Sequence, residues 1–154
     1  ETLLTLPVTF RDIILGKFLA GVVFVSAILV PTLVYPVFIA MMGELDWGPV
    51  IGGYAGAVML GAAFTAIGLF ASALTRNQII AFIMGAVICF ALTTMDRMLF
   101  FFPTPVLNVV NYLGASSHFQ NVAKGIIDSR DILYFLSLVF LGLYAAHLAM
   151  QEKK

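Results

Sequence analysis

Two histidines and one cysteine are the side chains of this 154-residue sequence best suited to binding a metal ion or a haem. His118 and His147 are expected near opposite ends of the molecule, too far apart to share one ligand set, and each is interpreted as an interfacial or capping residue. Cys89 is alone within an apolar run, so no disulfide and no cysteine-based metal site can form within one chain. We therefore expect no cofactor and no metal in this chain.

Sequence patterns of the common catalytic sites are absent. The sequence has no His-Glu-x-x-His, no Gly-x-Ser-x-Gly and no Gly-x4-Gly-Lys-Ser/Thr loop, the last of which would hold the phosphates of ATP. Charges inside a membrane usually mark ion or proton pathways, and the middles of the long apolar runs contain none. We predict that the chain is not an enzyme, with a membrane-embedded enzyme or haem protein as the least favoured alternative.

The composition indicates an integral membrane protein. Apolar residues make up 62% of the sequence and charged residues 10%, against about 25% charged residues in an average soluble protein. So few charged side chains cannot cover the surface of a water-soluble domain of this size. Eight Lys/Arg balance eight Asp/Glu without any basic block, which disfavours nucleic-acid binding. The chain is therefore expected to lie in a lipid bilayer.

Charged residues divide the sequence into five uncharged runs of the length that crosses a bilayer. About 20 apolar residues span a hydrocarbon core of about 30 Å as a helix. Four of the runs predict spanning helices, at about 17–42, 50–74, 78–96 and 131–150. These runs are apolar on all sides, so their length decides the assignment and helical periodicity adds little.

Prolines and glycines shape the first two predicted spans. Pro31 and Pro36 predict a kink in the first span, because proline lacks the N–H that a helix interior needs. Gly52 and Gly56 in the second span lie four residues apart, on one face of a helix. Such small residues let helices approach closely, and packing within one bundle is favoured here over a seam between two chains.

The fifth run is broken and predicts a different structure. Pro103 and Pro105 prevent a continuous helix, and Gly114 interrupts the remainder of the run. We expect two short helices, about 97–112 and 117–127, that dip into the membrane from the outer side and return to it. Broken backbone at this depth is tolerated where it packs against protein or lines water. A single kinked spanning helix is the competing interpretation.

Three places have the sequence pattern of a helix start. Thr9-Phe10-Arg11-Asp12 matches a capping box, in which a threonine and an acidic or amide side chain bond to each other's backbone N–H groups. Thr75-Arg76-Asn77-Gln78 predicts a second capping box, and Asp128 or Ser129 is expected to cap the last helix. Each pattern places a helix start just before an apolar run.

The Lys/Arg bias predicts the orientation, since these residues are enriched in cytoplasmic loops. With four crossings, one side of the membrane receives five basic residues, Arg11, Lys17, Arg76, Lys153 and Lys154. The other side receives Arg97, Lys124 and Arg130. This balance places the N-terminal segment and the C-terminus in the cytoplasm of a multi-pass protein of the inner, or plasma, membrane.

The first 16 residues form a short amphipathic segment ahead of the first span. It is broken by Pro7 and restarts at Thr9. Its charges are mixed, so its attraction to anionic lipid is weak, although an interfacial helix is an alternative. We interpret the segment as a cytoplasmic surface that docks into a groove of a partner protein. The expected contact residues are Leu6, Pro7, Val8, Thr9, Phe10, Arg11, Asp12, Ile13 and Ile14.

In four blocks the sequence resembles the membrane subunits, or permeases, of type-2 ABC transporters, and most closely their gliding-motility-type branch. The first block is Glu1 to Pro7 with Val8-Thr9, followed by Ile13-Ile14-Leu15-Gly16-Lys17-Phe18. The second is Gly68-Leu69-Phe70-Ala71-Ser72-Ala73-Leu74-Thr75-Arg76-Asn77-Gln78. The third and fourth are Ser117-His118-Phe119 with Gly125-Ile126-Ile127-Asp128, and Arg130-Asp131-Ile132-Leu133-Tyr134. The order of the blocks is more specific than any one of them.

The resemblance implies a fold and a place for each segment. Permeases of this family have six spans, so four would be present here, and the chain would be a C-terminal part lacking the first two. The segment around Leu6–Leu15 would be the coupling helix that rests on the nucleotide-binding subunit. Residues 97–127 would be the re-entrant pair between the last two spans, with Pro103, Pro105, Ser117, His118, Phe119 and Asp128 as its candidate functional residues.

The function implied by the resemblance is ATP-driven export. The partners would be an ABC ATPase subunit, which binds ATP and Mg²⁺, and a second permease copy in a homodimer or heterodimer. A non-transporting membrane anchor or assembly subunit is the alternative, and it would need no ATPase partner. Taken as a whole, the sequence predicts a single all-α permease domain over residues 1–154, with four spanning helices and a re-entrant pair.

Overall fold

The computed structural model describes residues 5–101, 103–126 and 128–152, and all regular structure in these ranges is helical. The elements are α1 (Phe10–Leu29), η2 (Val30–Leu33), α2 (Val34–Met42), α3 (Trp47–Leu74), α4 (Gln78–Thr94), η3 (Met95–Phe101), α5 (Thr104–Leu113), α6 (Ala115–Ala123) and α7 (Ser129–Gln151). The expected all-α fold is confirmed. Some of the predictions name Glu1–Leu4, Ile127, Lys153 or Lys154, and these residues lie outside the described ranges.

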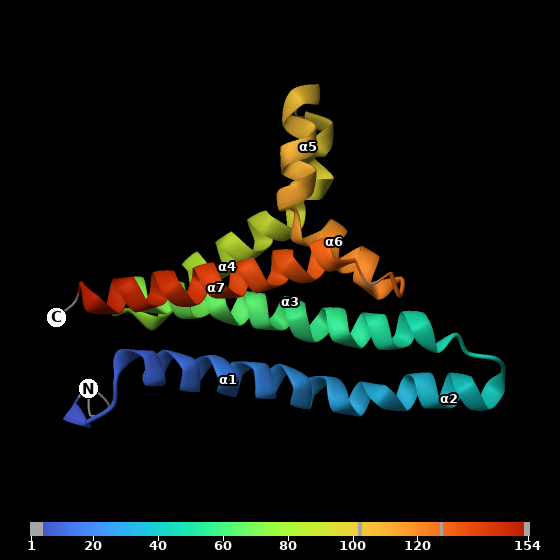
Figure 1. Ribbon diagram of the computed structural model, residues 1–154, viewed down its shortest axis with the longest axis horizontal. Coiled ribbons are helices and arrows are strands. Elements are labelled where there is room, and N and C mark those ends of the chain that lie inside the picture. Colours follow the sequence, from blue (N-terminus) through green and yellow to red (C-terminus); the bar gives the residue numbers. More distant parts are fainter. Residues whose placement is uncertain (1–4, 102, 127, 153–154) are drawn as a thin grey trace.

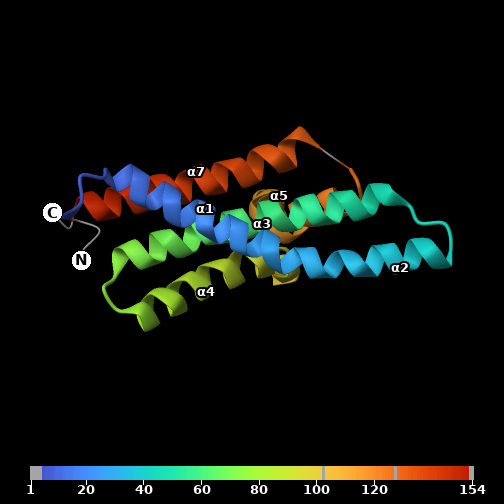
Figure 2. The ribbon, with the colours of Figure 1, turned by 90° about the horizontal axis from the view of Figure 1, so that it is seen from below.

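Helix α3 is the centre of the bundle, and α1, α4, α6 and α7 all pack against it (Figure 1). Figure 2 shows α1 and α4 running antiparallel to α3, while α7 runs parallel to it. The first turn of α1 and the last turns of α7 therefore lie at the same end of the molecule as the α3–α4 turn. We call this the terminal end, and the end with the α2–α3 turn the opposite end.

Three helical stretches are long and apolar enough to cross a membrane: residues 10–42, 47–74 and 129–151. At about 1.5 Å per residue, the shortest of them covers about 34 Å. Helix α4 is apolar but has 17 residues, which cover only about 25 Å. The structure thus contains three helices that meet the length of a spanning helix, and the fourth predicted span is shorter than expected.

The capping box at the start of α1 is confirmed. The Thr9 side chain accepts a hydrogen bond from the Asp12 backbone N–H, and the Asp12 carboxylate accepts one from the Thr9 backbone N–H. Because this cap starts the helix at Phe10, residues 10–16 belong to the same long helix as the first predicted span. A displacement of the segment before Thr9 would therefore act directly on a membrane helix.

A short 3-10 helix interrupts the first long helix at Pro31. Residues Val30–Leu33 form η2, between α1 and α2. Pro31 has no N–H for the α-helical ladder, which explains the local change in winding. The Thr32 hydroxyl lies 2.8 Å from the Tyr54 hydroxyl of α3, so the break also provides a polar contact between the two helices.

The second predicted capping box is wrong. Asn77, not Thr75, is the N-cap of α4, and its side chain accepts a hydrogen bond from the Ile79 backbone N–H. Thr75 instead ends α3 in an extended conformation and accepts from the Asn77 N–H. The chain needs these residues to reverse direction between two antiparallel helices, so α4 starts later than the pattern suggested. At α7 the cap is Asp128, one of the two expected residues.

Glycines of α3 make room for the second short helix, α6. A Cβ atom on Gly52 would lie 2.2 Å from the Val122 carbonyl oxygen, and one on Gly56 would touch Val122 and Phe119. The favoured interpretation of these glycines, packing within one bundle, agrees with these contacts. On α7, a Cβ atom on Gly142 would lie 2.9 Å from the Cβ of Ala66 of α3. Helix α3 is therefore held tightly on two sides.

The segment between α4 and α7 consists of short helices with a break at Gly114, as expected. Its boundaries differ from the expected 97–112 and 117–127. Residues 95–101 form the 3-10 helix η3, α5 starts at Thr104 because Pro103 and Pro105 suit a helix start, and α6 starts already at Ala115. In Figure 1, η3 and α5 project away from the bundle, whereas α6 returns to it.

Candidate functional site

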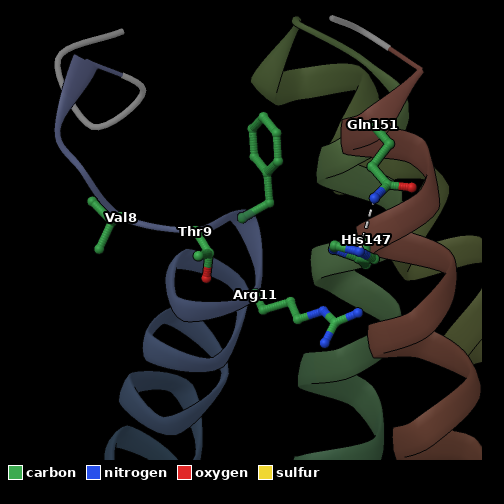
Figure 3. Close-up of a pocket in the computed structure, with 6 residues that line it drawn as sticks. Val8, Thr9, Arg11, His147 and Gln151 are labelled. Atoms are coloured by element: carbon green, nitrogen blue, oxygen red, sulfur yellow. Dashed lines mark hydrogen bonds between the residues drawn. The ribbon is translucent and has the colours of Figure 1, made fainter.

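The predicted docking segment lies beside the last turns of α7, at the terminal end. Residues from both chain regions line an open pocket of about 440 Å³ (Figure 3). The lining residues are Val8, Thr9, Phe10, Arg11, His147 and Gln151. Figure 3 shows Arg11 extending from α1 toward α7. The pocket at the predicted docking segment is thus formed by two elements, and the α7 contribution was not predicted from the sequence.

The predicted contact residues divide into an exposed part and an anchored part. Leu6 is 55% exposed and Val8 44%. Ile14, one turn into α1, is 5% exposed and packs against the bundle. The exposed residues are available to a partner, while Ile14 connects the segment mechanically to the helices behind it.

Electrostatics at this end are set by the cap and by one arginine. Asp12 lies in the first turn of α1, ahead of the apolar stretch that begins after Lys17. The side-chain hydrogen bond with Thr9, and then the backbone one, lower the pKa of the Asp12 carboxyl below its ordinary value. Asp12 is therefore ionised at neutral pH and occupied by its cap, whereas the exposed Arg11 presents its charge to the pocket.

His147 has a polar atom without a partner in this pocket. Its Nε2 lies 3.1 Å from the Gln151 amide nitrogen, which donates to it, so Nδ1 carries the hydrogen of the neutral ring. Nδ1 is buried and has no hydrogen-bond partner among the described residues.

A second polar site lies where α5, α6 and α7 meet. His118 of α6 is 7% exposed and Asp131 of α7 is 2% exposed. The His118 Nδ1 lies 2.5 Å from the Asp131 Oδ1, and the His118 Nε2 lies 2.7 Å from the carbonyl oxygen of Tyr112 at the end of α5. One imidazole therefore connects three helices, in a place where charged groups are normally excluded.

Aromatic rings surround this imidazole. The Tyr134 ring stacks on His118 with centroids 4.0 Å apart, and the Tyr112 ring meets it edge-on at 5.7 Å. The Tyr134 hydroxyl donates to the Leu113 carbonyl oxygen at 2.5 Å. The cluster thereby satisfies two carbonyls at the C-terminal end of α5, which have no partner within their own helix.

The other predicted residues of the outer segment have mainly structural roles. Pro103 and Asp128 occupy the N-cap positions of α5 and α7. Ser117 donates to carbonyl oxygens of Asn111 and Gly114, and Phe119 packs against Gly56. Of the candidates, only His118 belongs to the buried cluster. Asp131 and Tyr134 were missed as site residues, although both belong to a block on which the family resemblance rests.

The two histidines lie at opposite ends of α7, as predicted, since His118 contacts Asp131 in its first turn and His147 lies in its last turns. In the part of the chain that the structure describes, no three His, Cys, Asp or Glu side chains gather as a metal-ligand set. His118 is not interfacial, because it is buried in a hydrogen-bonded pair, but it caps the last turn of α5 through the Tyr112 carbonyl oxygen.

Comparison with known families gives one match. The model of a family described as "ABC-2 family transporter protein" matches residues 1–151, which include both the pocket at the terminal end and the cluster around His118. Neither the curated proteins nor the solved structures gave a match. The family match covers nearly the whole chain.

Proposed function

Because the chain belongs to the ABC-2 family of transporter proteins, we propose that it is the permease subunit of an exporter driven by ATP hydrolysis in a separate nucleotide-binding subunit. The family is a transport component rather than a catalyst, which agrees with the absence of a P-loop from the sequence. The gliding-motility-type branch, and two further spans preceding this domain, are finer parts of the same proposal.

Four crossings are the topology we propose, with the terminal end in the cytoplasm. Helix α4 starts at the terminal end, while α6 packs against Gly52 in the first turns of α3, at the opposite end. The chain between these points therefore travels most of the length of the bundle along α4 and α6, while η3 and α5 project away from it (Figure 1). The return of α6 to the bundle agrees with a re-entrant pair on the outer face.

The segment Leu6–Ile14 is the proposed contact with the ATPase subunit. The exposed Leu6 and Val8 offer apolar contact area, and Arg11 offers a positive charge beside the pocket. A push on this segment is transmitted along α1, since the cap at Thr9 makes it one piece with the membrane helix. Shifting an equilibrium from 1:99 to 99:1 takes about 5.5 kcal/mol, which differential ATP binding in the partner must supply.

The single observation that carries this proposal is the family match over residues 1–151. The direct test is stimulation of the ATPase by substrate or lipid in the full-length complex, with Arg11→Glu and Phe10→Ala. Both variants should lose the stimulation while inserting normally into the membrane. Lys124→Glu, a matched charge reversal at the opposite end, should keep it. Normal stimulation in both docking variants would contradict the assignment of the coupling segment.

We propose that the exposed apolar surface of α4 contacts lipid and a second permease copy. Helix α4 exposes Ile79, Phe82 and Phe90 by 70% or more, with no cover from this chain. In a bilayer these side chains contact acyl chains or another helix without any hydrophobic penalty. Cross-linking from Phe82 in membranes should give a permease–permease product if α4 faces the second copy.

A further inference from the structure

We propose that His118 and Asp131 form a proton-binding site whose single shared proton fastens helix α6 to helix α7. The proposal does not depend on transport, on the ATPase partner or on the direction of the membrane. It rests on two polar contacts of the buried His118, on one buried oxygen without a partner among the described residues, and on the number of hydrogens that this arrangement requires.

The first contact fixes one hydrogen. The His118 Nε2 lies 2.7 Å from the Tyr112 carbonyl oxygen. A carbonyl oxygen can only accept, so Nε2 must carry a hydrogen in the docked arrangement. The imidazole thereby acts as a donor to the end of α5, where the helix dipole favours positive charge.

The second contact requires one more hydrogen. The His118 Nδ1 and the Asp131 Oδ1 are 2.5 Å apart. Without a proton between them, two lone pairs would face each other at this distance, next to a buried carboxylate charge. With one proton, the pair is either imidazolium with carboxylate or imidazole with carboxylic acid, and both forms have zero net charge.

The third observation limits the site to that one proton. The Asp131 Oδ2 is buried and has no hydrogen-bond partner among the described residues. A further proton would have to bind to this oxygen, whose O–H would find no acceptor. It would also neutralise the carboxylate and leave the imidazolium without a counter-charge. Both gain and loss of a proton therefore leave an uncompensated buried charge.

Among the described residues, the groups in contact with the His118 ring offer no substitute charge in the docked state. The titratable groups in ring contact with His118 are Tyr112 and Tyr134, and the Tyr134 hydroxyl is bonded to Leu113. The Tyr134 ring also belongs to an apolar core with Ala63, against which Met59, Leu60 and Leu92 of α3 and α4 pack. Helix α6 contacts η3 as well, and Arg97 of η3 is exposed. Asp128 and Arg130, next to the pair on α7, are exposed, and the Asp128 side chain is used as the cap.

This proton count predicts a definite pH dependence. When α6 separates from α7, His118 meets water, and an imidazole in water carries its second proton only below about pH 6.5. Above that pH, docking must take up one proton, so docking weakens as the pH rises, by at most about tenfold per pH unit. Between about pH 4 and 6.5 both states hold the same number of protons, and docking should not change with pH.

Cysteine labelling in the full-length protein, reconstituted in lipid nanodiscs, can measure this. In a Cys89→Ala background, Ala115→Cys reports on docking, because Ala115 is 1% exposed and begins α6. Ala146→Cys is the matched control, since Ala146 is also 1% exposed but lies near the other end of α7. The ratio of the two maleimide labelling rates cancels the ordinary effect of pH on thiols.

The ratio of the Ala115→Cys rate to the Ala146→Cys rate should rise several-fold between pH 6.5 and pH 8.5. In Asp131→Asn the rise should vanish, because an amide N–H can donate to a neutral imidazole and docking no longer takes up a proton. His118→Gln should also abolish the rise of the ratio with pH. This variant is used in place of Asp131→Asn if Asp131→Asn does not fold. A flat ratio in the unsubstituted pair, or a rise that survives either substitution, would overturn the proposal.

Discussion

Single side chains hold the C-terminal end of α5 in place. Its last turn is capped by His118 and by Tyr134, from two other helices. Helix ends need such partners, since their final carbonyls find none within the helix. The two side chains thus stabilise the end of α5 at the break that lies at Gly114.

Removing one of these hydrogen bonds should measurably lower the free energy of unfolding. Tyr134→Phe keeps the ring stacked on His118 but leaves the Leu113 carbonyl without its donor. We expect a loss of about 1 kcal/mol in the free energy of unfolding, measured by thermal or denaturant unfolding in detergent. Tyr144→Phe is the control, because Tyr144 is 54% exposed and stacks on Phe140. An equal loss in both variants would show that the bond contributes nothing.

The cap of α1 should respond to acid. The pKa of the Asp12 carboxyl is lowered in the folded cap, so its stabilisation is present above the ordinary value of 3.8 and is lost as the pH falls through the lowered value. Hydrogen exchange at the first turn of α1 should therefore accelerate on acidification below about pH 4, relative to the second turn.

Thr9→Ala removes the hydroxyl that exchanges hydrogen bonds with Asp12, and should cost about 1 kcal/mol of local helix stability already at pH 7. Its exchange rates at the first turn should then change less between pH 6 and pH 3 than those of the unsubstituted protein, because only the backbone N–H at position 9 still donates to the Asp12 carboxylate. If the first turn of the unsubstituted protein were equally fast at both pH values, the cap would not be formed in membranes.

Between helices, glycines determine the closest approaches. Gly52→Ala should push α6 away from α3, because the added Cβ would lie 2.2 Å from a backbone oxygen. A loss of about 1–3 kcal/mol is expected from such overpacking. Gly53→Ala, one position along, meets nothing within 4 Å and should be neutral or stabilising by up to about 1 kcal/mol. Thermal unfolding of both variants measures the difference, and similar values would contradict the packing described here.

The features that could be predicted correctly from the sequence are those that depend on a few neighbouring residues. The cap at Thr9, the break at Gly114 and the Asp128 cap each depend on a few neighbouring residues, and all three are found in the structure. The box at Thr75 failed because the same pattern can end one helix and precede the next, and only the antiparallel packing of α3 and α4 decides between them. Boundaries of α5 and α6 shifted for a similar reason.

The buried cluster could not be predicted in the same way. His118 and Asp131 are 13 residues apart on different helices, and no periodicity connects them. The signal available was indirect, because the two residues belong to neighbouring blocks of the family resemblance. At the terminal end, Leu6 to Ile14 were predicted together, but His147 and Gln151 join them only through the fold.

At the scale of the whole molecule, α3 connects the terminal end to the helices at the opposite end. Close contacts at Gly21 and Gly61 join it to α1, and those at Gly52 and Gly142 join it to α6 and α7. Interfaces this tight shift as units rather than deforming gradually. A displacement of the docking segment therefore has a continuous path of packed helices to the opposite end.

Photo-cross-linking at the docking segment tests the central claim most directly. A photoactivatable residue at Val8, which is 44% exposed, would be introduced into the full-length protein in its native membranes. The account predicts a cross-link to a P-loop ATPase subunit, identified by mass spectrometry, and none from the same group placed at Trp47, at the opposite end of the bundle. A Val8 cross-link only to extracytoplasmic proteins, or to no ATPase in a complex that hydrolyses ATP, would contradict it.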